Sequence, residues 1–201
     1  MRVGADSLPA LACLSLIPRK HRFSLSRAGA MVLLTEGVPA RFQKGAEPMS
    51  EHHAAIAWTR ADHPDGNGSY SRNHLATLNG GQTVQVSAAV DYQGDGNCAD
   101  PEQLLVTSVS SCYMLFFLAI ADVKGYRVES YKDTPVGFLE KNEEGRLAVT
   151  RVELQPTIEF ADGQTPEPAE LQRLHAGAHR NCFIGNSLKT KVRLRTQSAA
   201  A

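Results

Sequence analysis

Residues 100–121 read DPEQLLVTSVSSCYMLFFLAIA, and this stretch predicts one long helix. Asp100 can accept hydrogen bonds from the free amides at a helix start, Pro101 is favoured in a first turn, and Glu102 suits the positive end of the helix dipole. The 18 residues from Leu104 to Ala121 carry no charge. We therefore expect a central helix that is buried on nearly all sides.

A membrane span is the alternative for this helix, because 18 residues rise about 27 Å at about 1.5 Å each. However, its first half contains four hydroxyl side chains, and no second apolar segment of this length occurs in the sequence. The hydroxyls belong to Thr107, Ser108, Ser110 and Ser111. We therefore reject the span and expect no membrane partner.

Short β-rich runs separated by Gly, Pro, Asp and Asn predict strands on both sides of the helix. Three runs precede it, at 54–59, 70–78 and 83–90, and Asn79-Gly80-Gly81 predicts a hairpin turn between the last two. Residues 126–140 and 147–160 predict a long hairpin after the helix. The fold class expected from this mixture is α+β.

A second helix is predicted by an apolar stripe that follows Pro166 and Pro168. A short helical turn over 183–188 and a last strand over 191–195 complete the expected elements. The stripe consists of Leu171, Leu174, Ala178 and Cys182.

Charge separates the first 48 residues from the rest of the chain. They carry seven basic and three acidic groups, against 14 and 18 in residues 49–201. We expect residues 1–48 to be a disordered extension, either an upstream addition to a natural start at Met49 or an organellar targeting segment, and 49–201 to be the folded domain. A secretory signal fits poorly, because Pro18 and Arg19 follow the apolar patch. The acidic domain lacks a Lys/Arg run, so nucleic acid is an unfavourable partner.

Four cysteines are too few and too scattered for a secreted disulfide scaffold, and no pair has the CxxC spacing. Thiol chemistry, metal binding and simple packing remain open for each. Cys112 stands in the middle of the predicted central helix, with Ser108 one turn before it and Leu115 and Phe116 one turn after. Cys13 has no expected role, and Cys98 is an accessory thiol or a third redox partner.

Two histidines share a helix face near the last cysteine. His175 and His179 are four residues apart, and Cys182 follows three residues later. A zinc site would need a fourth ligand that the sequence does not supply, so we expect no metal. The histidines are then helix-surface or interface residues, or His179 orients or deprotonates Cys182.

Two motifs together resemble the OsmC/Ohr family of hydroperoxide-reducing proteins. The first is Asp100-Pro-Glu-Gln-Leu-Leu leading to Ser110-Ser-Cys112, and the second is Asn181-Cys-Phe-Ile-Gly-Asn-Ser-Leu188. The resemblance covers about residues 54–195. It implies an α+β fold in which two subunits intertwine as a homodimer, with long central helices packed between curved antiparallel sheets and two active sites at the dimer interface.

The same resemblance implies roles for individual residues. Cys112 would attack the peroxide and become a sulfenic acid, and Cys182 would resolve it as a disulfide. Glu102 would hold an arginine that lowers the thiol pKa. We prefer Arg72, because strand alternation places it on one face with His74, over Arg60.

Glu102 and Cys112 cannot touch on one helix, since ten residues rise about 15 Å. Either a long arginine spans part of that distance, or the glutamate and the cysteine of one site come from different subunits.

The implied function is a thiol-dependent peroxidase that reduces organic hydroperoxides, with a small or protein-bound dithiol as reductant, no cofactor and a cytoplasmic location. The apolar residues 113–117 beside Cys112 favour bulky organic substrates over hydrogen peroxide. The alternative is a non-catalytic redox sensor or apolar-ligand-binding protein on the same fold. It is kept open because Phe183 stands where the family often has proline, and because the arginine is unassigned.

Overall fold

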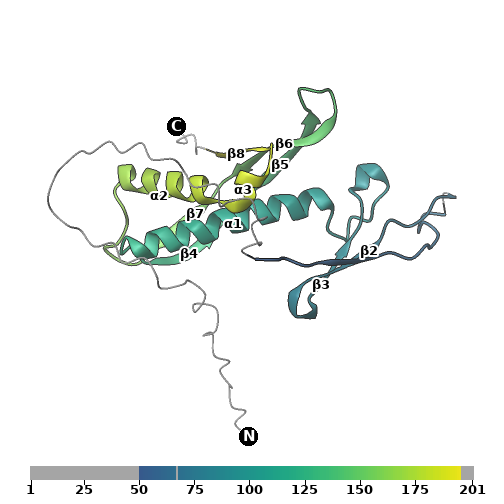
Figure 1. The fold of residues 1–201 in the computed structure, drawn as a ribbon, viewed down its shortest axis with the longest axis horizontal. Helices are drawn as coiled ribbons and strands as arrows, with labels where there is room; N and C mark the ends of the chain where they lie inside the picture. The colour runs from purple at the N-terminus through teal and green to yellow at the C-terminus, as the bar shows by residue number, and fades with distance from the viewer. Residues whose placement is uncertain (1–49, 67, 196–201) are drawn as a thin grey trace, which may run out of the picture. The chain divides into compact units, whose positions relative to one another are not determined.

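The computed structural model describes residues 50–66 and 68–195, and the predictions for residues 1–48 and for Cys13 lie outside them. Helices and strands alternate in a mixed order (Figure 1), which confirms the predicted α+β class. In chain order the elements are β1 (Ala55–Ala57), β2 (His74–Thr77), η1 (Asn79–Gly81), β3 (Thr83–Val86), η2 (Val90–Tyr92), α1 (Pro101–Val123), β4 (Val128–Lys132), β5 (Val136–Lys141), β6 (Leu147–Leu154), β7 (Thr157–Phe160), α2 (Pro168–Asn181), α3 (Phe183–Ser187) and β8 (Lys191–Leu194).

The first sheet has the antiparallel order β1-β2-β3. The predicted turn between β2 and β3 is confirmed, and Gly80 and Gly81 adopt φ values of 71° and 75° that favour glycine. Arg72 precedes β2, so its predicted place on a strand is wrong. The backbone around Arg72 bonds locally instead, because the Arg72 carbonyl lies 2.9 Å from Nδ1 of His74 and the Asn73 N–H donates to Ser71 Oγ at 3.2 Å.

The predicted start of the central helix is confirmed in detail. The Gln103 N–H donates to Asp100 Oδ1 at 2.7 Å, and the Asp100 N–H donates to Gln103 Oε1 at 3.2 Å. This reciprocal pair is a capping box, and Pro101 occupies the first turn. Ala99, just before it, is hydrogen-bonded to Gln85 and Ser87, so the end of β3 is tied to the helix start.

One side of α1 is buried in the chain and the other is not. Leu104, Leu115 and Val123 are exposed, so the prediction that the helix is buried on nearly all sides is wrong for a single chain. Within the described ranges, α1 alone has the length and apolar composition of a membrane span, although core helices share these properties. Its buried residues are Val106, Val109, Ser110, Tyr113, Phe117 and Ala121.

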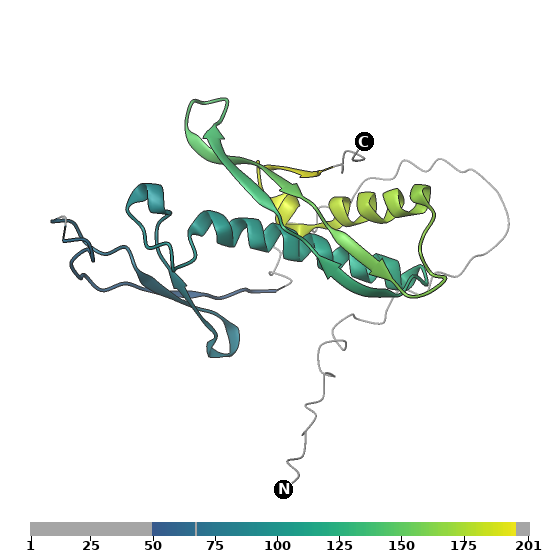
Figure 2. The same ribbon diagram turned by 180° about the vertical axis from the view of Figure 1, so that it is seen from behind.

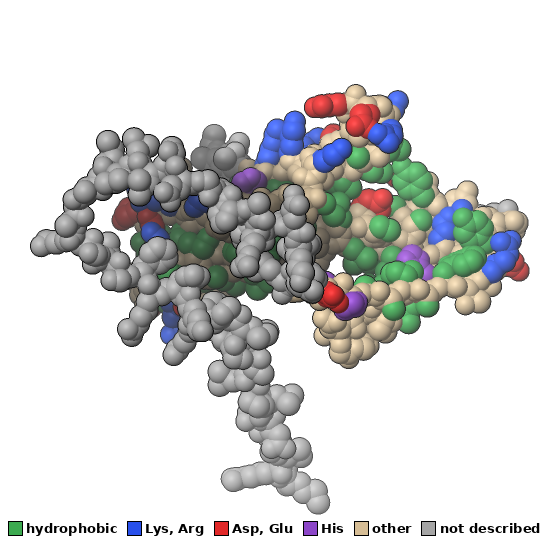
Figure 3. All heavy atoms as spheres, viewed as in Figure 1, with side chains coloured by type: hydrophobic (Ala, Val, Ile, Leu, Met, Phe, Trp, Pro, Cys, Tyr) green, Lys and Arg blue, Asp and Glu red, His purple; other side chains and the backbone are tan. Residues whose placement is uncertain are grey.

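The predicted long hairpin after α1 forms, but it is divided between two sheets. β4 pairs with β7, and β5 pairs with β6, all antiparallel. Asp133 stands at the break, where it accepts the Gln155 N–H at 2.7 Å and the Ser110 hydroxyl of α1 at 2.6 Å. β8 adds to β6 in parallel. The tip of the β5–β6 hairpin gathers acidic and basic side chains (Figure 3), among them the ion pair of Glu144 and Arg146.

The predicted second helix, α2, runs beside α1 in both views (Figures 1 and 2). Its apolar stripe lies in the core as predicted, since Leu174, Ala178 and Cys182 are buried against residues of α1. The short helix and the last strand are also confirmed as α3 and β8. This packing positions the end of α2 against the middle of α1.

Candidate active site

Two cysteines from distant parts of the sequence meet in this core. Cys112 is half-buried in the middle of α1, and Cys182 is 2% exposed where α2 ends and α3 begins. Cys112 packs against the buried cluster that contains Cys182, its thiol raises the pKa of the Cys182 thiol, and both are free thiols in this structure. The chain therefore brings together the two residues that the motifs predict as a redox pair.

The backbone around Cys182 holds its sulfur in place. The Cys182 N–H donates to the Ala178 carbonyl at 3.0 Å, which ends α2. Its Sγ accepts the Gly185 N–H at 3.3 Å, which caps α3, and lies 4.0 Å from the Val109 carbonyl of α1. The sequence did not predict this cap, because cysteine is not among the usual N-cap residues.

Burial raises the pKa of the Cys182 thiol, because the thiolate would lose its hydration. The Gly185 N–H opposes this rise, and the neighbouring Cys112 thiol adds to it. Cys182 therefore rests as a neutral thiol near pH 7 and must lose its proton when it reacts.

The surroundings of Cys112 differ along the helix axis. Toward the N-terminus lie Ser108, whose hydroxyl donates to the Leu105 carbonyl at 2.7 Å, and the exposed Ser111. Toward the C-terminus lies Phe116, whose ring meets that of Phe183 edge to face with centroids 4.9 Å apart. The thiol thus has a polar side and an aromatic side.

His175 belongs to a buried hydrogen bond rather than to a metal cluster. Its Nδ1 lies 2.9 Å from the Tyr113 hydroxyl, which also donates to the His175 carbonyl at 3.2 Å. Burial lowers the pKa of His175 and raises that of Tyr113 above its usual range. The sequence placed Tyr113 and Phe117 in the apolar surface expected to meet the substrate, but the two side chains are 1% and 0% exposed and lie in the core.

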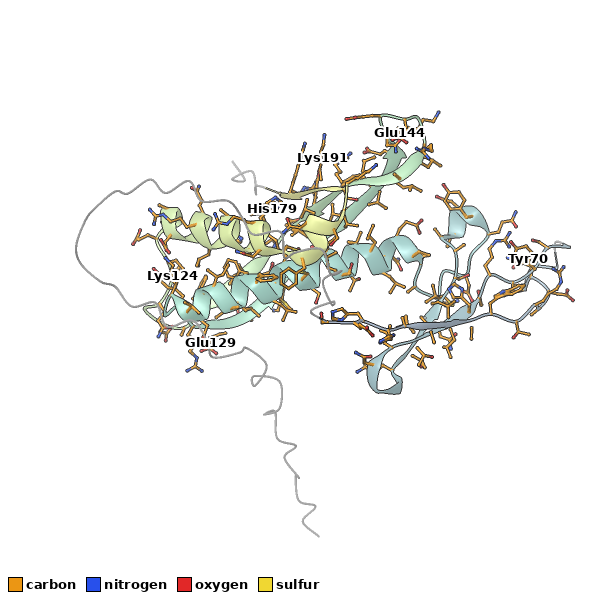
Figure 4. All side chains as sticks on the ribbon, viewed as in Figure 1. Tyr70, Lys124, Glu129, Glu144, His179 and Lys191 are labelled. Carbon is orange, nitrogen blue, oxygen red and sulfur yellow. The ribbon has the colours of Figure 1, made fainter. Side chains whose placement is uncertain are left out.

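His179 is exposed and lines a hollow of about 340 Å³ with Lys191 at the start of β8 (Figure 4). Between residues 50 and 195, position 67 excepted, no hydrogen bond joins His179 to Cys182, and no three metal-binding side chains are grouped to hold an ion. The role of His179 as a base for Cys182 stays a prediction.

Arg72 is held by the loop that follows β3. Its guanidinium donates to the Tyr70 carbonyl at 2.9 Å and to Gln93 Oε1 at 2.8 Å, and it stands 4.8 Å above the Tyr70 ring, which Figure 4 labels. Gln93 has a φ of 62°, a left-handed conformation that is uncommon for a non-glycine residue. Arg60 approaches the same ring at 5.8 Å. Both candidate arginines therefore share one aromatic neighbour.

Glu102 is half-buried in the first turn of α1 and borders a hollow between α1 and β5. Within the described part of the chain it has no hydrogen bond or ion pair, and neither Glu102 nor Arg72 contacts Cys112. A single chain thus assembles the two thiols and leaves the expected activating pair apart.

Cys98 lies half-buried in the loop before α1 and is a free thiol. Burial raises its pKa, and the adjacent Asp95 carboxylate raises it further. Its thiol faces Asp95 rather than the other two cysteines, which agrees with an accessory position.

The fold and the paired cysteines define a class of two-thiol α+β proteins, and comparison with known proteins identifies the family. The family model of OsmC-like proteins matches residues 94–197. A Vibrio cholerae OsmC-like protein of unknown function is 39% identical, with a TM-score of 0.68, over 73% of this chain and 99% of that one. The chain belongs to the OsmC-like family.

More distant relatives agree with this fold. An organic hydroperoxide resistance protein from Elizabethkingia anophelis is 18% identical, with a TM-score of 0.56, over 74% of this chain and 98% of its own. A Legionella pneumophila structure described as an organic hydroperoxide resistance protein OsmC is 16% identical, with a TM-score of 0.53, over 74% and 98%. The uncharacterized protein YmaD of Bacillus subtilis is 21% identical over 153 residues, 75% of this chain and 96% of its own. The predicted family and the α+β fold of the single chain are confirmed, and the intertwined homodimer stays a prediction.

Proposed function

We propose that this protein is a thiol-dependent peroxidase that reduces organic hydroperoxides through Cys112 and Cys182. The observation that carries the proposal is the packing of Cys112 of α1 against the buried cluster that holds Cys182 at the α2–α3 junction, where the Cys112 thiol raises the pKa of the Cys182 thiol. Membership of a family that includes proteins named for organic hydroperoxide resistance supports it.

The first step is attack of the Cys112 thiolate on the outer oxygen of the hydroperoxide. The O–O bond breaks as the S–O bond forms, which leaves a sulfenic acid on Cys112 and an alkoxide that takes up a proton to become the alcohol. Cys112 is the better nucleophile of the pair, because it is half-exposed while Cys182 is 2% exposed with a raised pKa.

The second step joins the two sulfurs. Cys182 attacks the Cys112 sulfenic acid, its proton leaves with the hydroxide as water, and a Cys112–Cys182 disulfide forms. A small or protein-bound dithiol then exchanges with this disulfide, becomes oxidised itself and restores both thiols. The packing of Cys112 against the cluster that holds Cys182 favours this step.

The site is completed by a second copy of the chain in this proposal. The exposed side of α1 is free of charge from Leu104 to Ala121, and Glu102 on the same helix lacks a partner among residues 50–66 and 68–195. Packing two α1 helices together would bury that side and bring the Arg72 and Glu102 region of one chain toward Cys112 of the other. The dimer is then a requirement for activity, and a cytoplasmic location with reduced dithiols suits the chemistry.

Consumption of tert-butyl hydroperoxide under a dithiol reductant tests this function with wild type, Cys112→Ser and Cys182→Ser. We expect Cys112→Ser to have no turnover under the dithiol. Without reductant, Cys182→Ser should consume one equivalent and stop at a sulfenic or overoxidised Cys112, which mass spectrometry detects. Cys98→Ser is the matched control and should turn over like wild type. Equal turnover in all variants would contradict the mechanism, and no turnover with retained binding of an apolar dye would favour a ligand-binding protein.

A further inference from the structure

We propose that Phe183 and Phe116 form an aromatic wall beside the two thiols, and that this wall makes aryl-substituted hydroperoxides the preferred substrates. The inference rests on the proposed peroxidase function and names its substrate class. It assigns a specificity role to Phe183, one of the most exposed large apolar residues described in the chain.

Each ring of the wall is attached next to one of the thiols. Phe116 lies one helical turn after Cys112 on α1, and Phe183 directly follows Cys182. The two rings meet edge to face, with centroids 4.9 Å apart and planes at 83°. The wall therefore spans both sulfur-bearing elements.

The backbone of Phe183 is held by hydrogen bonds of the α3 turn, although the side chain is 71% exposed. Its carbonyl accepts the Ser187 hydroxyl at 2.8 Å, and the Asn186 N–H donates to the Cys182 carbonyl at 2.9 Å, so the α3 turn fixes the backbone on both sides of it. A fixed aromatic face open on one side favours a flat apolar group, because a further ring can join the pair at stacking distance with little loss of side-chain entropy.

The polar and aromatic sides of Cys112 also set the orientation of the substrate. Along the axis of α1, Ser108 lies one turn before Cys112, and Leu115 and Phe116 lie one turn after it. The peroxide oxygens are then directed toward the side of Cys112 where Ser108 lies. The carbon substituent of the peroxide is directed toward the aromatic wall. A phenyl group gains ring contacts with Phe183, a methyl group gains little, and hydrogen peroxide gains none.

The test compares cumene hydroperoxide with tert-butyl hydroperoxide, which share a tertiary carbon and differ by a phenyl in place of a methyl group. The proteins are wild type, Phe183→Ala, Phe183→Leu and, as a matched exposed apolar control on β6, Leu147→Ala. We expect the ratio of kcat/KM for cumene over tert-butyl hydroperoxide to fall about tenfold in Phe183→Ala and less in Phe183→Leu. The rate with hydrogen peroxide, and the ratio in Leu147→Ala, should stay within about twofold of wild type.

Each outcome has a distinct meaning. If wild type reduces tert-butyl hydroperoxide and the ratio is unchanged in Phe183→Ala, the aromatic wall is overturned while the peroxidase stands. An equal loss with all three peroxides overturns it as well, since Phe183 would then support the site without selecting substrates. If wild type reduces none of the three, the peroxidase proposal itself fails. Thermal melts of each variant check folding, which we expect to be retained because the Phe183 side chain is mostly outside the core.

Discussion

The two thiols and the Arg72 loop are held in the chain by different kinds of contact. Cys182 is positioned by the apolar stripe of α2, which buries Leu174 and Ala178 against α1. Arg72 is positioned by polar contacts to Tyr70 and Gln93 outside that core. Burial of apolar surface is non-directional, so one chain can bury the stripe of α2 by itself. Arg72, in contrast, has no ion pair with its expected partner Glu102 within the described part of that chain. In the proposed mechanism, the two thiols therefore come together within one subunit, whereas the pairing of Arg72 with Glu102 would need a second copy of the chain.

The largest effect should come from removing Arg72, the arginine that we propose activates Cys112. We expect Arg72→Ala to slow the oxidation of Cys112 by about 100-fold, since a lost electrostatic donor typically costs that much. Stoichiometric oxidation of the thiol by tert-butyl hydroperoxide, followed in rapid mixing, measures this rate without the reductant step. Arg60→Ala is the control and should stay within about twofold. The opposite result would assign the role to Arg60.

A charge on the exposed side of α1 should separate the subunits. We expect Leu115→Glu to raise the dimer dissociation constant by about 100-fold, because a carboxylate would be buried without a partner. Leu147→Glu on β6 is a matched control, since both leucines are 59% exposed in the single chain. Analytical ultracentrifugation measures both proteins. Equal dimer strength in the two variants would remove α1 from the interface.

The start of α1, which lies between the Arg72 loop and the two cysteines, can be destabilised by removing its N-cap. Asp100→Ala removes the bond to the Gln103 N–H and should lower the free energy of unfolding by about 1 kcal/mol. The expected fall in Tm is about 2–4 °C. Asp100→Asn retains an acceptor and should recover most of the loss, so equal destabilisation by both variants would contradict the capping role.

The smallest effect is a pH dependence of stability from the buried thiol. Burial raises the pKa of Cys182, so the unfolded chain ionises this thiol at a lower pH than the folded chain. The contribution of the Cys182 thiol to the free energy of unfolding is therefore complete below about pH 8.5, and it is lost as the pH rises through the pKa of the folded state. Cys98 and Tyr113, whose pKa values are also raised, add to the same trend.

Urea unfolding at pH 7.5 and 9.5 measures this dependence. The loss of stability between the two values should be smaller in Cys182→Ala than in wild type. An unchanged loss would show that Cys182 is not the group that titrates.

Features that depend on neighbours in the sequence were predictable. The start of α1 follows from Asp100 and Pro101, the β2–β3 turn from two glycines, and the buried face of α2 from its 3.6-residue stripe. The stripe even placed Cys182 in the core. Such features need only local hydrogen bonds or one apolar face, which residue order specifies.

Features that depend on distant partners were not predictable in the same way. Arg72 lies before β2 rather than on it, because side chains of Ser71 and His74 bond the backbone there. His175 is engaged by Tyr113, 62 residues away in the sequence. The single-sided burial of α1 was also missed, because apolar composition does not say whether the covering surface belongs to the same chain.

The sequence by itself determined the α+β elements, the capped central helix and the two motifs that mark the OsmC-like family. Only the tertiary structure decided that Cys112 packs against the cluster that holds Cys182, and that Glu102 and Arg72 form no ion pair within the described part of one chain. The physical reason is that helix caps, turns and apolar helix faces depend on residues close together in the sequence. Whether two side chains 70 positions apart come together depends on how whole helices pack.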